Sequence, residues 1–221
     1  MKNNIQIAID GPASAGKSTV AKLVAKKLNY VYCDTGAMYR AITFEAMAKN
    51  VALDNDDKLV SLLKDTIISF KPANPEQLVY INNLDITQAI RQPEVTNNVS
   101  TVAAQEGVRK ELVKRQQEIA EDGSIVMDGR DIGTTVLPNA EVKIFLVASV
   151  KERALRRFKE NQIKGINTTL DVLEFEIAER DRKDSTREIS PLIQAKDAIL
   201  VDTTSMNIDG VVQKIMDIIN K

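Results

Sequence analysis

Gly11-Pro12-Ala13-Ser14-Ala15-Gly16-Lys17-Ser18 is the stretch of this sequence that decides the fold. It follows an apolar run at 5–10 and precedes a helical pattern at 19–28. A strand, a glycine-containing loop and a helix in that order are the setting of a phosphate-binding P-loop. The two glycines accept backbone angles that other residues avoid, so successive N–H groups can turn toward a phosphate. The positive end of the following helix dipole adds to this attraction, and we expect the loop to bind a nucleoside triphosphate.

Two side chains at the end of the loop predict its chemistry. Lys17 can reach the terminal phosphates, and the Ser18 hydroxyl can ligate a magnesium ion. The alternative is a glycine turn that precedes an ordinary helix by chance. The full eight-residue spacing and the correct flanks on both sides disfavour it.

Composition limits the possible function classes. The 221 residues include 30 Lys and Arg against 31 Asp and Glu, so the net charge of −1 argues against bulk electrostatic binding to nucleic acid or to a membrane surface. There is no visible signal peptide and no apolar run of transmembrane length, and we expect a cytoplasmic protein with one core that carries insertions.

Histidine is absent, and Cys33 is the single cysteine. These two facts exclude a Ser-His-Asp arrangement, a Cys-His pair, histidine metal sites and an internal disulfide. Cys33 ends the apolar run 30–33, where we expect a small buried side chain. The remaining chemistry must use carboxylates, Lys, Arg, hydroxyls and backbone amides, which suits phosphoryl transfer because its catalysis is mostly positioning and charge neutralisation.

The periodicity of the chain predicts an α/β fold with a central parallel sheet flanked by helices, because strands and helices alternate through short connections. The expected strands are 5–10, 30–33, 125–128, 142–147 and 198–201, and the expected helices are 19–28, 37–49, 54–64, 104–120, 150–162, 169–183 and 208–219. A strand at 66–70 and a hairpin that turns at Asn82-Asn83 predict a small α+β insertion over about 62–103.

Arginines concentrate late in the chain. Six of the eleven lie between 153 and 187. Arg153, Arg156 and Arg157 share a helical face, where their like charges repel one another unless a negative group lies nearby. One interpretation is a solvated face neutralised by nearby glutamates. We favour a mobile lid of two charged helices, joined by a turn at 164–167, that closes over the phosphates and excludes water.

Acid–arginine pairs occur in three stretches that we expect to be loops where strands end: 34–40, 128–131 and 184–187. Arginine suits planar, bidentate recognition of a phosphate, and a carboxylate suits a ribose hydroxyl or an exocyclic amine. The alternative is simple ion pairs that hold the loops together. Asp131 does not fit that alternative easily, because Arg130 cannot readily serve two neighbouring carboxylates.

At these residues the chain resembles the nucleoside monophosphate kinases, and among them the bacterial cytidylate kinases. The resemblance covers nearly the whole length and rests on 11–18, Asp34-Thr35-Gly36-Ala37-Met38-Tyr39-Arg40, Asp128-Gly129-Arg130-Asp131-Ile132-Gly133-Thr134 and the run from Glu179 to Arg187. It implies a three-layer P-loop fold. The core would comprise about 1–61, 104–152 and 188–221, the monophosphate-binding insertion about 62–103, and the helical lid about 153–187.

The resemblance also implies the reaction, an ATP-dependent phosphorylation of CMP and dCMP that serves pyrimidine nucleotide metabolism, with Mg²⁺ and a monomeric enzyme. ATP phosphates would contact Gly11, Pro12, Ala13, Ser14, Ala15, Gly16, Lys17, Ser18 and Thr19. Arg40, Arg130 and Arg180 would hold the phosphate of the acceptor; Ser100, Arg109 and Asp131 would read the cytosine; and Asp184, Arg187 and Thr35 would lie at the sugar. The implied catalytic set is Lys17, Arg130, Arg157 and Arg180, with Ser18 as the metal ligand.

Cytosine carries an amine donor where uracil carries an acceptor oxygen, so a fixed carboxylate such as Asp131 would favour one base and repel the other. Rival interpretations are a P-loop kinase that acts on UMP or AMP, a GTPase switch, and a nucleotide-binding protein without catalysis. The sequence has neither Asn-Lys-X-Asp nor Asp-X-X-Gly, which disfavours the GTPase. Retention of Lys17, Ser18 and the arginines disfavours the binding protein.

Overall fold

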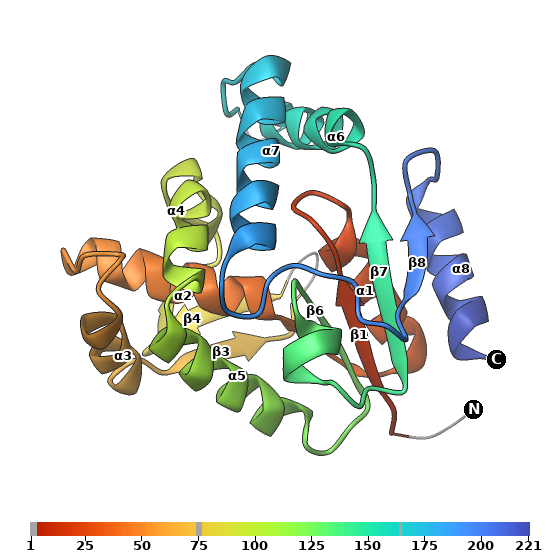
Figure 1. Cartoon of the computed structure of the whole chain (residues 1–221), viewed down its shortest axis with the longest axis horizontal. Coiled ribbons are helices and arrows are strands. Elements are labelled where there is room, and N and C mark those ends of the chain that lie inside the picture. Colours follow the sequence, from red (N-terminus) through yellow and green to blue (C-terminus); the bar gives the residue numbers. More distant parts are fainter. Residues whose placement is uncertain (1–3, 74–76, 164) are drawn as a thin grey trace. The chain divides into compact units, whose positions relative to one another are not determined.

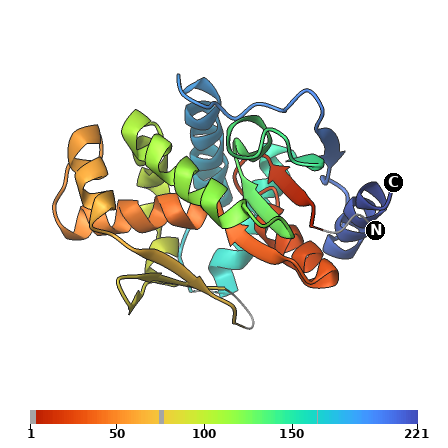
Figure 2. The same ribbon diagram turned by 90° about the horizontal axis from the view of Figure 1, so that it is seen from below.

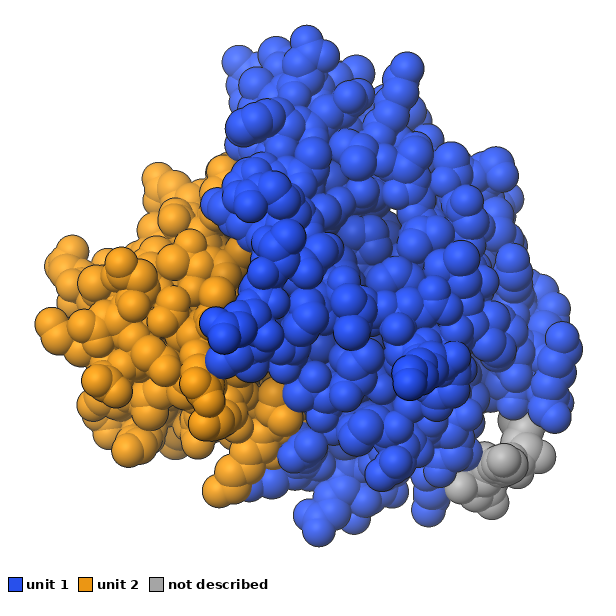
Figure 3. All heavy atoms as spheres, in the orientation of Figure 1, with its two compact units in different colours: residues 1–34, 117–221 blue, residues 35–116 orange. Residues whose placement is uncertain are grey.

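The computed structural model describes residues 4–73, 77–163 and 165–221. These residues form two compact units, the first made of Met1–Asp34 and Gln117–Lys221 and the second of Thr35–Gln116 (Figure 3). The predicted insertion at 62–103 lies inside the second unit, which extends beyond it on both sides. The division into core, insertion and lid therefore stays a prediction.

In the first unit, five strands among the described residues form one parallel sheet in the order β2-β6-β1-β7-β8 (Figure 1). They are β1 (Gln6–Asp10), β2 (Val31–Asp34), β6 (Ile125–Gly129), β7 (Val142–Val147) and β8 (Ile199–Asp202). The parallel sheet expected from the sequence is confirmed. The register pairs Asp10 with Gly129 and Asp34 with Asp128, so the P-loop and the 128–131 stretch leave the same edge of the sheet.

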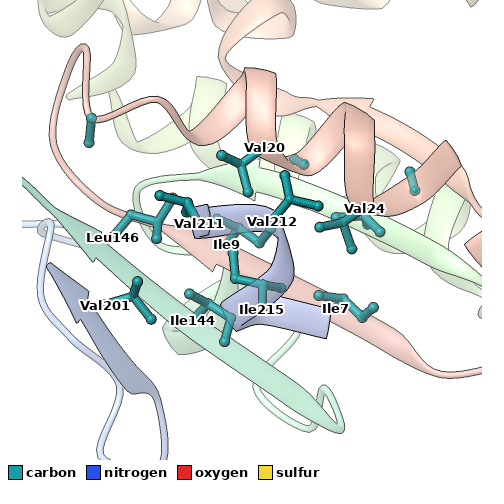
Figure 4. Close-up of a cluster of buried hydrophobic side chains, with 14 of the residues drawn as sticks. Ile7, Ile9, Val20, Val24, Ile144, Leu146, Val201, Val211, Val212 and Ile215 are labelled. Carbon is teal, nitrogen blue, oxygen red and sulfur yellow. The ribbon is translucent and has the colours of Figure 1, made fainter. Parts of the chain in front are cut away.

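Helices α1 (Lys17–Leu28) and α8 (Ile208–Ile219) pack against this sheet. The buried cluster contains Ile7 and Ile9 of β1, Val24 of α1 and Ile215 of α8 (Figure 4). The middle of β1 is buried on both faces, as expected for a central parallel strand covered on each side. Cys33 is 1% exposed and, as expected, behaves as a small core residue.

The predicted pair of charged helices is present as α6 (Val150–Ile163) and α7 (Leu170–Thr186). The two helices pack through Ala154, Leu173 and Ile177, and the Thr169 side chain caps the start of α7. In the predicted turn at 164–167, Lys164 lies outside the described residues and Gly165 has a φ of 69°. The left-handed backbone at Gly165 explains why glycine occurs there.

The second unit contains a small antiparallel sheet of β3 (Ile68–Lys71), β4 (Leu78–Ile81) and β5 (Leu84–Asp85), and the sheet packs against α2 (Thr35–Ala48) (Figure 2). The hairpin prediction is confirmed: Asn82 and Asn83 both have positive φ at the β4–β5 turn. The unit also holds α3 (Asp56–Lys64), η1 (Ala89–Arg91) and α4 (Pro93–Ala103). Most of α5 (Glu106–Ala120) belongs to it as well.

Helix α4 was not expected from the sequence. From the sequence alone, Pro93 indicates a break between segments, whereas in the structure it occupies the first turn of the helix. Proline is well suited to that position because the first helical N–H groups have no partner within the helix. In the described part of the chain, no helix is long and apolar enough to cross a membrane.

Candidate functional site

The P-loop joins β1 to α1 and depends on its glycines. Gly11 has a φ of 147°, and a Cβ there would stand 2.1 Å from the carbonyl oxygen of Leu146. Gly16 caps α1 with a φ of 89°. Both positions therefore require the backbone freedom that the sequence analysis assigned to them.

Lys17 is buried, with 5% of its surface exposed, and its Nζ donates a hydrogen bond to the carbonyl oxygen of Pro12 at 2.7 Å. Burial lowers the pKa of Lys17 well below its usual value, and the positive charges of Arg130 and Arg180 lower it further. Asp128 and Asp10 act in the opposite direction. The positive charges of Arg130 and Arg180 and the negative charges of Asp128 and Asp10 therefore all act on Lys17 from nearby.

Asp128, at the end of β6, is the partner of the P-loop that the sequence analysis missed. Its Oδ2 accepts a hydrogen bond from Ser18 Oγ at 2.8 Å, and its Oδ1 accepts one from the Tyr32 hydroxyl at 2.7 Å. Burial and the neighbouring Asp34 raise the pKa of Asp128 to about 6. In the sequence, Asp128 belongs to an acid–arginine stretch, and its proximity to Ser18 depends on the strand order, which puts β6 beside β1.

The Ser18 hydroxyl and the Asp128 carboxylate fit a magnesium site. Both are hard oxygen ligands, and a P-loop serine with an aspartate from a neighbouring strand is a known pair for this ion. Within the described ranges, no group of three or more His, Cys, Asp or Glu could hold a metal ion.

The 128–131 stretch and the 184–187 stretch are joined by two ion pairs. Arg130 Nε lies 2.9 Å from Asp184 Oδ2, and Arg187 Nη2 lies 3.4 Å from Asp131 Oδ1. Arg187 also donates to the carbonyl oxygen of Ser190. Both ion pairs therefore connect the two stretches: Asp131 pairs with Arg187, and Arg130 pairs with Asp184.

Asp10 anchors the loop after Asp131 to the central strand. Its carboxylate accepts hydrogen bonds from the N–H groups of Ile132 at 2.8 Å and Gly133 at 2.7 Å. Burial raises its pKa to about 6, although the two backbone donors act to lower it. This residue closes β1 and precedes Gly11, so it links the P-loop with the Asp131 loop.

The arginines of helices α6 and α7 differ in their surroundings. Arg153 is 4% exposed and pairs with Asp181 of α7, while Arg156 pairs with Glu152 and donates to the carbonyl oxygen of Thr203. Arg157 and Arg180 are half-buried. Arg153 and Arg156 are thus paired with acidic groups of the protein, and the Arg156–Glu152 pair is the kind of neutralisation that the alternative interpretation expected.

Four of the predicted substrate residues belong to the second unit. Thr35 begins α2 and is buried, Arg40 lies half-buried on the same helix, and Ser100 is buried on α4. Arg109 of α5 is 2% exposed, donates to the carbonyl oxygen of Ala103 at 3.1 Å and lies over the Tyr39 ring at 5.3 Å. The roles assigned to these residues stay predictions.

Residues 7–221 match the family model described as cytidylate kinase. The chain is 67% identical over 221 residues to a cytidylate kinase of Ligilactobacillus salivarius, covering 100% of this chain and 99% of the relative. It is 63% identical over 220 residues to a cytidylate kinase of Lactiplantibacillus plantarum, covering 100% and 96%.

Among solved structures, the fold is similar to that of a gluconokinase from Sinorhizobium meliloti, with a TM-score of 0.51, 12% identity and coverage of 98% of this chain and 92% of that one. It is also similar to an uncharacterised protein of Eubacterium ventriosum, with a TM-score of 0.56, 11% identity and 99% coverage of both chains. At these identities the likeness concerns the fold alone.

Proposed function

Because the chain belongs to the cytidylate kinase family, we propose that it transfers the γ-phosphoryl group of ATP to the phosphate of CMP or dCMP, giving CDP or dCDP. The observation that carries the proposal is the centre formed by the buried Lys17 of a glycine-shaped P-loop and the nearby positive charges of Arg130 and Arg180. Such a centre supports phosphoryl transfer because negative charge spreads over the transferred group in the transition state.

ATP would bind along 11–19, with its phosphates against the loop amides and the start of α1. Lys17, Arg130, Arg157 and Arg180 would stabilise the phosphoryl group during transfer. Bound at Ser18 and Asp128, Mg²⁺ would neutralise phosphate charge. The acceptor phosphate is already an anionic nucleophile, so we assign no general base.

The monophosphate would be held by Arg40, Arg130 and Arg180 at its phosphate. Asp184, Arg187 and Thr35 would contact its sugar, and Ser100, Arg109 and Asp131 would contact its base. Support for the base assignment comes from the burial of Asp131 and Arg109, 4% and 2% exposed, because a buried hydrogen-bonding group discriminates strongly against the wrong base. We further propose that the chain acts as a cytoplasmic monomer, and a sedimentation mass well above 24.5 kDa would contradict the monomer.

The test is ADP release from ATP and Mg²⁺ with CMP, dCMP, UMP, AMP and GMP offered separately. We expect strong turnover with CMP and dCMP alone. Lys17→Ala is the matched control, and it should abolish turnover while the circular dichroism spectrum stays that of the folded protein. Turnover with a different acceptor would support a P-loop kinase but contradict the residues assigned to the base. No turnover with any of the five acceptors would favour a nucleotide-binding protein without catalysis.

A further inference from the structure

We infer that Arg153 and Asp181 are positioning residues that hold the P-loop in its ATP-binding shape. This inference rests on the proposed function, because it concerns the same ATP phosphates. The two residues come from the two helices of the lid pair, Arg153 from α6 and Asp181 from α7. Neither was assigned to the catalytic, ATP or substrate sets.

The contacts converge on one residue of the loop, Ala13. Arg153 Nη1 donates to the Ala13 carbonyl oxygen at 3.0 Å, and the Ala13 N–H donates to Asp181 Oδ1 at 3.3 Å. Arg153 Nη1 also lies 2.6 Å from Asp181 Oδ2, and its Nε donates to the carbonyl oxygen of Ala148 at 2.9 Å. The ion pair therefore engages both backbone groups of Ala13 at once.

Burial distinguishes this pair, which joins α6 and α7, from the surface ion pair Glu179–Arg182 within α7. The Arg153 side chain is 4% exposed and that of Asp181 is 19% exposed, whereas Arg182 and Glu179 are 62% and 34% exposed. An exposed pair is screened by solvent and contributes little, but removing one partner of a buried pair leaves an uncompensated charge. The Arg153–Asp181 pair is therefore expected to matter where the Glu179–Arg182 pair does not.

The charges decide the sign of the effect. Asp181 places a carboxylate against the loop that binds the phosphates of ATP, and this carboxylate would repel them if it stood alone. Arg153 neutralises it. Loss of Arg153 should therefore weaken ATP binding more than loss of Asp181, and removing Asp181 as well should restore part of the affinity.

The experiment is a double-mutant cycle on the full chain, read by calorimetric titration with Mg²⁺ and the ATP analogue AMPPNP, which needs no acceptor. We expect Arg153→Met to weaken AMPPNP binding about tenfold, and the Arg153→Met/Asp181→Ala double variant to bind more tightly than Arg153→Met alone. In turnover assays the KM for ATP should rise, while the KM for CMP changes less than about twofold. The surface pair Glu179→Ala/Arg182→Met is the matched control and should bind like the wild type.

A second comparison keeps the proposal falsifiable if Arg153→Met does not fold. Asp181→Asn keeps an oxygen that can accept from the Ala13 N–H, whereas Asp181→Ala does not, so Asp181→Ala should bind AMPPNP more weakly than Asp181→Asn. Equal binding by these two variants, or a double variant weaker than Arg153→Met, would overturn the inference. If the wild type binds AMPPNP but phosphorylates no cytidine monophosphate, the proposed function fails and the cycle still decides the role of the pair.

Discussion

Asp131 is the residue on which base selectivity is expected to depend. It is 4% exposed and lies 3.4 Å from Arg187, so its carboxylate is held in one place at the end of β6. We predict that Asp131→Ala lowers the ratio of kcat/KM for CMP to that for UMP by about tenfold or more, because the buried acceptor for the cytosine amine is lost. The ratio is measured by coupled ADP release, with exposed Asp122→Ala as control. An unchanged ratio would mean that the base is recognised by other residues.

Asp128 makes stability depend on pH in a predictable direction. Its pKa is about 6 in the folded chain against the usual 3.8, so the folded state holds the proton more tightly between about pH 4 and 6. The free energy of unfolding therefore falls as pH rises through this window. Above pH 6, where the Asp128 carboxylate is ionised in the folded state, this loss of stability reaches its full size. We predict that Asp128→Asn, which cannot ionise, is more stable than the wild type at pH 7.5 by on the order of 3 kcal/mol.

Urea unfolding at pH 4.5, 6 and 7.5 measures this difference, which should shrink as the pH falls toward 4. The same variant should lose phosphoryl transfer, because it lacks the carboxylate expected to bind Mg²⁺. A variant less stable than the wild type at pH 7.5 would mean that the hydrogen bonds from Ser18 and Tyr32 outweigh the cost of burying the charge.

At the residue scale, site residues could be predicted from the sequence when they belong to one local motif. The eight residues of the P-loop carry their own turn geometry, so Lys17 and Ser18 could be assigned directly. Asp181 and Asp128 could not be connected to that loop, because they contact it from 168 and 110 positions away. Such contacts depend on strand order and helix packing, which the periodicity of the sequence does not specify.

The loops of this chain differ in how strictly they require glycine. A Cβ at Gly11 would stand 2.1 Å from backbone, whereas a Cβ at Gly165 has nothing within 4 Å, and both residues have positive φ. We predict that Gly11→Ala costs about 3 kcal/mol or more of stability and abolishes ATP binding, while Gly165→Ala costs about 1 kcal/mol. Thermal and urea unfolding of the two variants side by side measure this. Similar losses for both would show that the close approach at Gly11 relaxes easily.

Helices α6 and α7 carry the arginines that we expect to close over the phosphates. Arg180 of α7 is near enough to Lys17 to lower its pKa, so nucleotide binding should tighten this helix pair. We predict slower amide hydrogen exchange in α6 and α7 when Mg²⁺, AMPPNP and CMP are bound together. Exchange in α8, which lies on the sheet, serves as the internal reference. Exchange in α6 and α7 that is indifferent to nucleotide would contradict the lid.

Elements were predictable where apolar periodicity and turn residues agree. The strand Val142–Val147 and the helix Ile208–Ile219 have the bounds expected from the sequence, because each is a clear apolar pattern between polar ends. Helix α4 was missed because Pro93 is as compatible with a break between two segments as with the first turn of a helix. The π-helix η2 (Ile132–Val136) has no sequence signal of its own, and its start is fixed by the distant carboxylate of Asp10.

At the scale of the whole molecule, the alternation of strands and helices was enough to predict the parallel sheet, but the bounds of its compact units were not predictable. The second unit begins at Thr35, directly after β2, whereas a change in periodicity placed the start of the insertion near 62. Helices α2 and α3 belong to that unit by contact, although their sequence pattern does not assign them to one unit or the other. Contacts between distant segments define a unit, and composition alone does not report them.

The stability of the whole chain should report base selectivity without any turnover. A ligand that binds only the folded state at a hundred times its Kd raises the free energy of unfolding by about 2.7 kcal/mol. For a chain of this length each kcal/mol corresponds to about 2–4 °C, so saturating CMP should raise the Tm by about 5–10 °C. UMP at the same concentration should raise it far less, because its carbonyl oxygen faces the carboxylate of Asp131 where cytosine offers an amine. Differential scanning fluorimetry measures both shifts, and Asp131→Ala should bring them together. Equal shifts in the wild type would place the selectivity of this enzyme in the chemical step rather than in binding.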